Sequence, residues 1–85
     1  MTQFDKIIDK ILRGTSDSNI DFSDVCHLLQ NLGFHERIKG SHHIFYRENV
    51  EEFLNLQAKG SSAKAYQIRQ VRELIIKSKL HESLS

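Results

Sequence analysis

The sequence predicts an α+β domain in which helices pack on one face of a three-stranded antiparallel sheet, in the order α-α-β-β-β-α. Apolar residues recur with helical spacing near both ends of the chain, whereas the middle carries short runs rich in β-branched and aromatic residues. With 85 residues and 39% hydrophobic content, the chain is long enough for one domain with one small core.

The first expected element is a helix from Thr2 to Arg13, with Thr2 as N-cap and Gly14 as its C-terminal stop. Thr15 to Asn19 is a polar linker. The apolar stripe of this helix comprises Phe4, Ile7, Ile8, Ile11 and Leu12. A stripe this strong must be buried, either on the domain or in a partner.

A second helix follows, with its stripe formed by Val25, Leu28, Leu29 and Leu32. Asp21 is one candidate for its N-cap and Ser23 is the competing one. Gly33 ends the helix, and Phe34 can fold back against its last turn.

Three strands are expected next: His35–Lys39, His42–Arg47 and Glu52–Gln57. Gly40-Ser41 is the hairpin turn between the first two. Ile38 is the only apolar anchor of the first strand. In the third strand, alternation places Leu54 and Leu56 on one face of the sheet.

The last helix is expected from Ala63 to Lys79, after a loop from Ala58 to Ser62. Ser61 or Ser62 can cap it. Its buried stripe would comprise Ile68, Val71, Leu74 and Ile75. The remaining residues, 81–85, carry no strong signal and form a flexible tail.

Composition excludes several classes of protein. The only cysteine is Cys26, so no intrachain disulfide forms, and no apolar run is long enough to span a bilayer. Without a signal-peptide pattern, we expect a cytoplasmic protein that does not act at a membrane.

The net charge of the chain is only +1, but basic residues outnumber acidic ones after His35 and not before it.

The stretch from Lys39 to Phe45 carries the most chemical information. A glycine-serine turn precedes two histidines that begin a strand. Successive strand residues face opposite sides of a sheet, so at most one of His42 and His43 faces a substrate directly. A histidine on a rigid strand, framed by cations, suits proton transfer at a phosphodiester.

Other chemistries have less support. Adjacent histidines on a strand diverge, and no cysteine or carboxylate cluster has ligand spacing, so we expect no metal site. We expect Cys26 to be a small buried hydrophobe of the second helix rather than a nucleophile.

Gly40-Ser41-His42-His43, followed by Ile44 and Phe45 and set between an amphipathic helix and a C-terminal helix, resembles the HicA-type mRNA interferase toxins of bacterial toxin–antitoxin pairs. The resemblance extends from about Asp21 to Leu80 and implies a fold similar to double-stranded RNA-binding domains. It divides the chain into an N-terminal extension with its linker (1–19), a HicA-like domain (20–80) and the tail (81–85).

The resemblance implies a metal-independent endoribonuclease, needing no cofactor, that cleaves mRNA and is silenced by a HicB-type antitoxin. The histidine of the Gly-Ser-X-His pattern falls on His43, which becomes the expected general base. Gly40, Ser41 and His42 would support it. The cations expected to hold RNA are Arg37, Lys39, Arg47, Lys59 and Lys64, and Tyr66 could stack on a base.

The chain departs from the family in two ways. The first helix is an extension, and a Pro-His-Pro-like run near the end of the third strand is replaced by Leu56-Gln57-Ala58-Lys59-Gly60. Gln57 cannot transfer a proton as a histidine does. Two alternatives therefore stay open: a non-catalytic RNA-binding module, and a module that docks a protein partner through Ile7 and Ile11 of the first helix.

Overall fold

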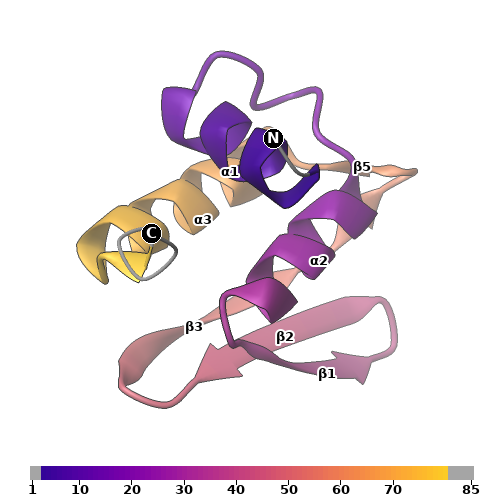
Figure 1. Ribbon diagram of the computed structural model, residues 1–85. Helices are drawn as coiled ribbons and strands as arrows, with labels where there is room; N and C mark the ends of the chain where they lie inside the picture. The colour runs from indigo at the N-terminus through magenta and orange to yellow at the C-terminus, as the bar shows by residue number, and fades with distance from the viewer. Residues whose placement is uncertain (1–2, 81–85) are drawn as a thin grey trace.

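The computed structural model describes residues 3–80 and confirms the α+β fold with helices on one sheet face (Figure 1). Its elements are α1 (Gln3–Arg13), α2 (Phe22–Asn31), β1 (His35–Lys39), β2 (His42–Arg47), β3 (Val50–Leu56), β4 (Ala58–Lys59), β5 (Ser62–Ala63) and α3 (Ala65–Lys77). The expected cap Thr2 and the tail lie outside the described residues. No helix within residues 3–80 is long and apolar enough to cross a membrane.

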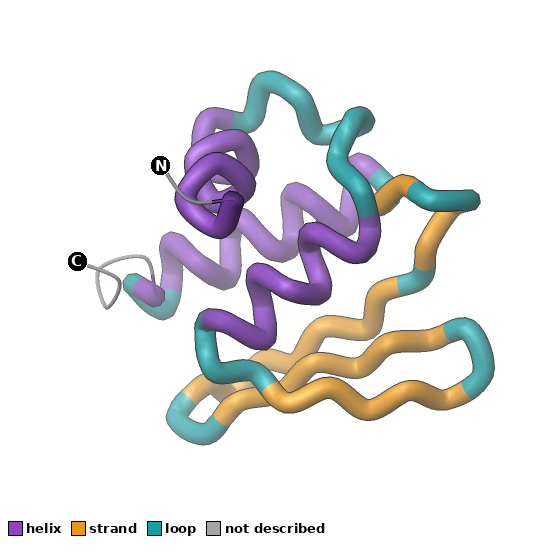
Figure 2. The backbone as a smooth tube through the Cα atoms, turned by 45° about the vertical axis from the view of Figure 1, so that its right-hand side comes forward, coloured by secondary structure: helices purple, strands orange, loops and turns teal. Residues whose placement is uncertain are grey.

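The sheet is antiparallel, with β2 between β1 and β3. The three helices lie on one side of it, and no described element covers the other side (Figure 2). Lys39 pairs with His42, and Ile38 pairs with His43, so the turn between β1 and β2 contains two residues, as expected.

The core lies between the sheet and the helices. The sheet contributes Phe45, Leu54 and Leu56, of which Phe45 is fully buried. The helices α2 and α3 contribute the two stripes that the sequence predicted, with Val25, Leu29, Ile68, Val71 and Ile75 fully buried.

Helix α1 packs on α2 and α3, which settles where its apolar stripe is buried. Ile11 is 0% exposed, and Ile7 and Ile8 are also buried. Arg72 of α3 fixes the segment after α1 by donating from Nη1 to the Asp17 carboxylate at 2.9 Å and 3.1 Å. The stripe therefore belongs to this domain's own core, so it is not free to dock a partner through Ile7 and Ile11.

Several expectations about the elements were wrong. The last helix runs from Ala65 to Lys77 and not from Ala63 to Lys79. β3 begins at Val50 rather than Glu52, and the expected loop after it contains the short β4–β5 hairpin. The N-cap of α3 is Lys64, because Ser62 and Ala63 are extended in β5 and pair with β4. Ile38 does not anchor β1, because its side chain is 61% exposed at the sheet edge.

Candidate functional site

The turn between β1 and β2 decides what each histidine faces. Gly40 has φ +62°, a left-handed conformation that a glycine adopts without strain. His42 follows on the open face of the sheet, where its Nδ1 lies 3.0 Å from Asn55 Oδ1. His43 points to the helix-covered face, so the expected division of the two histidines between faces is confirmed.

His43 is held by partners from two elements. Its Nδ1 lies 2.6 Å from Glu36 Oε2 on β1. Its ring meets Phe22, the first residue of α2, edge-on with centroids 4.9 Å apart. When Glu36 is ionised and the imidazole is neutral, Nδ1 donates to the carboxylate and the lone pair lies on Nε2. A quarter of the His43 side chain is exposed, which leaves a route for a substrate.

Glu36 is the site residue that sequence reasoning missed. Its second oxygen, Oε1, accepts a 2.8 Å hydrogen bond from Gln30 Nε2 on α2, so the carboxylate is fixed at both ends. The register of the β1–β2 hairpin could have predicted that Glu36 lies beside His43. A two-residue turn puts Ile38 opposite His43, and Glu36 is then the diagonal neighbour on the same face.

Cys26 lies beside this pair. Burial, and to a lesser extent the negative charge of Glu36, raise the pKa of its thiol to about 11. The thiol is therefore protonated at neutral pH, in agreement with the expected role as a buried hydrophobe. Cys26, Glu36 and His43 each bring one potential metal-ligand atom within 4.8 Å of the others. No sequence spacing indicated this group, because its members come from α2, β1 and β2.

Two of the expected RNA-binding cations lie together. Lys59 and Lys64 line one hollow with Tyr66, at the β4–β5 hairpin and the start of α3. This hairpin and the β1–β2 turn lie at the same end of the molecule (Figures 1 and 2). The two are linked through Phe22, whose backbone N–H donates to the Ser61 carbonyl at 2.9 Å.

The other three cations are placed differently. Arg37 pairs with Ile44 and so faces the open side of the sheet, opposite to His43. Lys39 is exposed at the turn itself. Arg47 lies about 13 Å along β2 from His43, at roughly 3.3 Å per residue. Its Nη1 is buried without a hydrogen-bond partner among the described residues.

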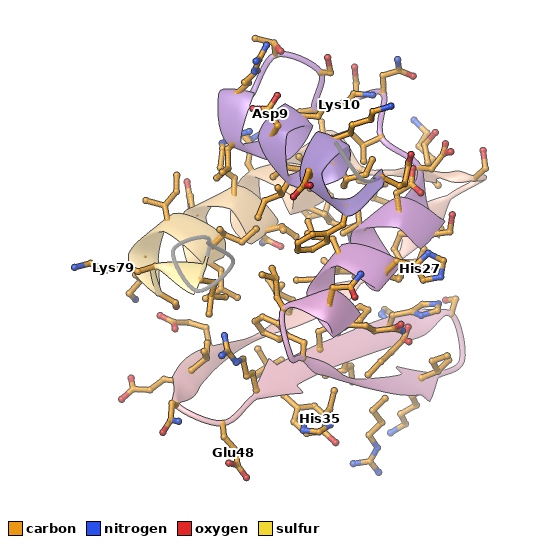
Figure 3. The ribbon with its side chains drawn as sticks, in the orientation of Figure 1. Asp9, Lys10, His27, His35, Glu48 and Lys79 are labelled. Carbon is orange, nitrogen blue, oxygen red and sulfur yellow. The ribbon has the colours of Figure 1, made fainter. Side chains whose placement is uncertain are left out.

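The open face of the sheet carries other side chains. His35 points away from the helices (Figure 3) and stacks at a tilt on Tyr46, with ring centroids 5.4 Å apart. His27 is exposed on α2, as its position off the apolar stripe predicted.

Gln57, which replaces the second histidine of the resembled pattern, has a structural role. Its Nε2 donates to Ser41 Oγ at 3.0 Å, which ties the end of β3 to the turn before His43. The buried amide of Gln67 satisfies the Gln57 backbone when its nitrogen donates to the Gln57 carbonyl and its oxygen accepts from the Gln57 N–H, both at 3.0 Å. The Ser41 side chain is thus held in the β1–β2 turn by Gln57, which follows β3.

This fold and this turn define a class of protein: a small α+β domain like the double-stranded RNA-binding domain, with a histidine fixed behind a glycine-serine hairpin. The family model described as the HicA toxin of bacterial toxin-antitoxin matches residues 22–77, and the chain belongs to that family. Membership implies an antitoxin partner. The match runs from the first residue of α2 to the last of α3, so α1 is an addition to it. Neither the curated proteins nor the solved structures include a match to this chain.

Proposed function

We propose that this protein is an endoribonuclease that cleaves mRNA, with His43 as general base. The observation that carries the proposal is the 2.6 Å contact between His43 Nδ1 and Glu36 Oε2. It supports the proposal because, in the neutral ring, donation from Nδ1 to Glu36 leaves the lone pair on Nε2, where it can accept a proton. Glu36 is then a positioning residue that also stabilises the imidazolium formed during the reaction.

The reaction needs no metal in this scheme. Nε2 of His43 takes the proton of a ribose 2′-OH, and the 2′ oxygen attacks the adjacent phosphorus. The bond from phosphorus to the 5′ oxygen breaks, so the products carry a 2′,3′-cyclic phosphate and a 5′-OH. The leaving oxygen takes a proton from a lysine or water, because His42 lies on the opposite face of the sheet.

Cations at the same end of the molecule support binding of the RNA backbone. Lys59 and Lys64 are exposed or half-buried in one hollow, next to the Tyr66 ring. We propose that they and Lys39 bind phosphates, since phosphate contacts supply most of the affinity for RNA. Arg37 and Arg47 face away from this region or lie far along β2, which argues against a direct role at the scissile phosphate.

The test is cleavage of an end-labelled mRNA by purified protein in EDTA. The His43→Ala variant should lose cleavage by about 100-fold or more, the usual contribution of a general base. His42→Ala is the matched control, because it removes a neighbouring imidazole from the opposite face. Equal cleavage by wild type and His43→Ala would refute the proposal.

Glu36→Gln tests the positioning role. The amide keeps the size of the side chain but no longer stabilises an imidazolium, so kcat should fall by at least about tenfold with KM unchanged. The acidic limb of the pH–rate profile should also move. A change in KM alone would show that Glu36 contributes to binding and not to the base.

A second candidate function is RNA binding without cleavage. The observation in its favour is Gln57, which occupies the position of the family's second histidine and is engaged with Ser41. Intact RNA bound by both wild type and His43→Ala, with loss of binding in Lys59→Ala, would establish this function instead.

We propose further that the antitoxin is of the HicB type, that it covers His43, and that the pair acts in the cytoplasm, where mRNA is found. Ile38 supports the covering: it is the direct neighbour of His43 on the same sheet face, and 61% of its side chain is exposed. Ile38→Lys should weaken the complex with an antitoxin encoded beside this chain, as measured by co-purification. If Ile38→Lys co-purifies with the antitoxin as well as the wild type does, the antitoxin binds a different surface.

A further inference from the structure

Three side chains of different chemistry converge beside His43. Cys26 on α2, Glu36 on β1 and His43 on β2 each offer one ligand atom, and all three atoms lie within 4.8 Å of one another. A thiol, an imidazole and a carboxylate together suit Zn²⁺, which binds sulfur, nitrogen and oxygen. Mg²⁺ and Ca²⁺ prefer oxygen alone.

The geometry needs a small adjustment to hold the ion. Ligands of a tetrahedral Zn²⁺ site lie about 2.0–2.3 Å from the metal, and so about 3.3–3.8 Å from each other. The 2.6 Å separation of His43 Nδ1 and Glu36 Oε2 must therefore open by about 1 Å. These two side chains are 25% and 18% exposed, so an ion can reach them from solvent.

The surroundings already contain an outer partner for such a site. Gln30 Nε2 holds Glu36 Oε1 at 2.8 Å, which leaves Oε2 to face the other two ligand atoms. A ligating carboxylate in metal sites is commonly fixed by a hydrogen bond of this kind.

We propose that Cys26, Glu36 and His43 form an inhibitory Zn²⁺ site, with water as the fourth ligand, that switches His43 off. The ion displaces the proton of the Cys26 thiol, which passes to solvent. It also displaces the imidazole proton of His43 from Nδ1, and Nε2 takes up one proton in exchange through solvent, so the ring stays neutral. A neutral imidazole bound to metal through Nδ1 carries its proton on Nε2. Nε2 then has no lone pair with which to accept the 2′-OH proton. The inhibition rests on the proposed function, whereas the binding site does not.

The first experiment reads binding without reference to activity. Co²⁺, a spectroscopic substitute for Zn²⁺, is added to the metal-free full chain, and thiolate-to-cobalt charge-transfer absorption is followed. One equivalent should produce the band, and Zn²⁺ should abolish it by competition. Cys26→Ser should not show the band, whereas His27→Ala, which removes an exposed histidine from the same helix, should retain it. Absence of the band in the wild type overturns the proposal.

Glu36→Gln is the second variant, used whether or not Cys26→Ser folds. It leaves the thiolate band possible but should weaken Co²⁺ binding by at least about tenfold, since even outer partners of metal sites are worth 10- to 100-fold. Unchanged affinity would exclude the three-residue site. Circular dichroism of each variant without metal checks that the fold is intact.

The second experiment tests inhibition. If the wild type cleaves RNA in EDTA, micromolar free Zn²⁺ should stop cleavage, and EDTA should restore it. Cys26→Ser should need at least about tenfold more Zn²⁺. Equal inhibition of both proteins would show that the metal acts elsewhere. If the wild type does not cleave RNA, the proposed function fails, while the cobalt spectrum still decides whether the site exists.

Discussion

At the scale of single residues, the site depends on a pair rather than on a lone histidine. His43 alone would be an ordinary half-buried strand residue. The carboxylate of Glu36, itself fixed by Gln30, orients the ring through its contact with Nδ1. The edge-on contact with Phe22 adds an apolar wall to the ring. The proposed role of His43 as general base requires preorganisation of this kind.

Cys26 should react slowly with thiol reagents in the native protein. With a pKa of about 11 against an ordinary value of 9.0, its thiolate fraction at pH 7.5 is about 100-fold below that of a free cysteine. Iodoacetamide labelling followed by mass spectrometry, in EDTA, should therefore be at least about 100-fold slower in buffer than in urea. Similar rates in the two conditions would mean that the thiol is exposed and unperturbed.

Gly40→Ala should destabilise the fold by about 1 kcal/mol, the cost of a side chain in the left-handed region. A Cβ at this position would meet no atom within 4 Å, so the loss comes from the backbone and not from a clash. Gly40→Asn should lose less, because asparagine tolerates this conformation. Urea unfolding of the two variants makes the comparison, and equal losses would point to a contact instead.

At the scale of elements, α1 is part of the domain although the family match begins after it. Its stripe packs on α2 and α3, and the Arg72–Asp17 ion pair fixes the segment that follows it. Both groups of the pair are largely shielded from solvent, at 19% and 15% exposure, so removing one partner would leave a shielded charge unpaired. The extension is therefore held on α3 both by its apolar stripe and by the Arg72–Asp17 ion pair.

Ile11→Ala should lower the free energy of unfolding by about 3 kcal/mol, because Ile11 is fully buried and its loss leaves a cavity. Ile76→Ala is the control: its side chain is 52% exposed on α3, and the change should stay within about 0.5 kcal/mol. Urea denaturation measures both. A small loss for Ile11→Ala would show that α1 is only loosely attached.

At the scale of the whole molecule, charge distribution matters more than net charge. A total of +1 would not attract RNA, but Lys59, Lys64 and Lys39 gather at the end of the molecule that holds the β1–β2 turn.

RNA binding should therefore weaken steeply with salt. Lys59→Ala and Lys64→Ala should each reduce the slope of log affinity against log salt by about 0.7, the value for one phosphate contact with a single strand. Lys6→Ala, on the exposed face of α1, should leave the slope unchanged. Fluorescence anisotropy with a short labelled RNA, using the His43→Ala background to prevent cleavage, gives the slopes. An equal effect of all three lysines would indicate non-specific attraction only.

Local patterns in the sequence were enough to predict the fold class, the bounds of β1 and β2, the hairpin turn and the faces of the two histidines. These features depend on local periodicity and on a two-residue turn, both of which are properties of neighbouring residues. It also determined the family, because the Gly-Ser-X-His pattern is local. The cap of α3 escaped prediction, because β5 formation overrode the local preference of Ser62.

Only the tertiary structure decided which residues surround His43 and which cations accompany it. Phe22, Cys26 and Gln30 reach the site from α2, and that placement depends on how α2 packs across the sheet. It likewise separated Lys59 and Lys64 from Arg37 and Arg47, although all four were expected from the sequence to hold RNA. The physical reason is that contacts between elements depend on side-chain packing and strand register, which a pattern of residue types along the chain does not specify.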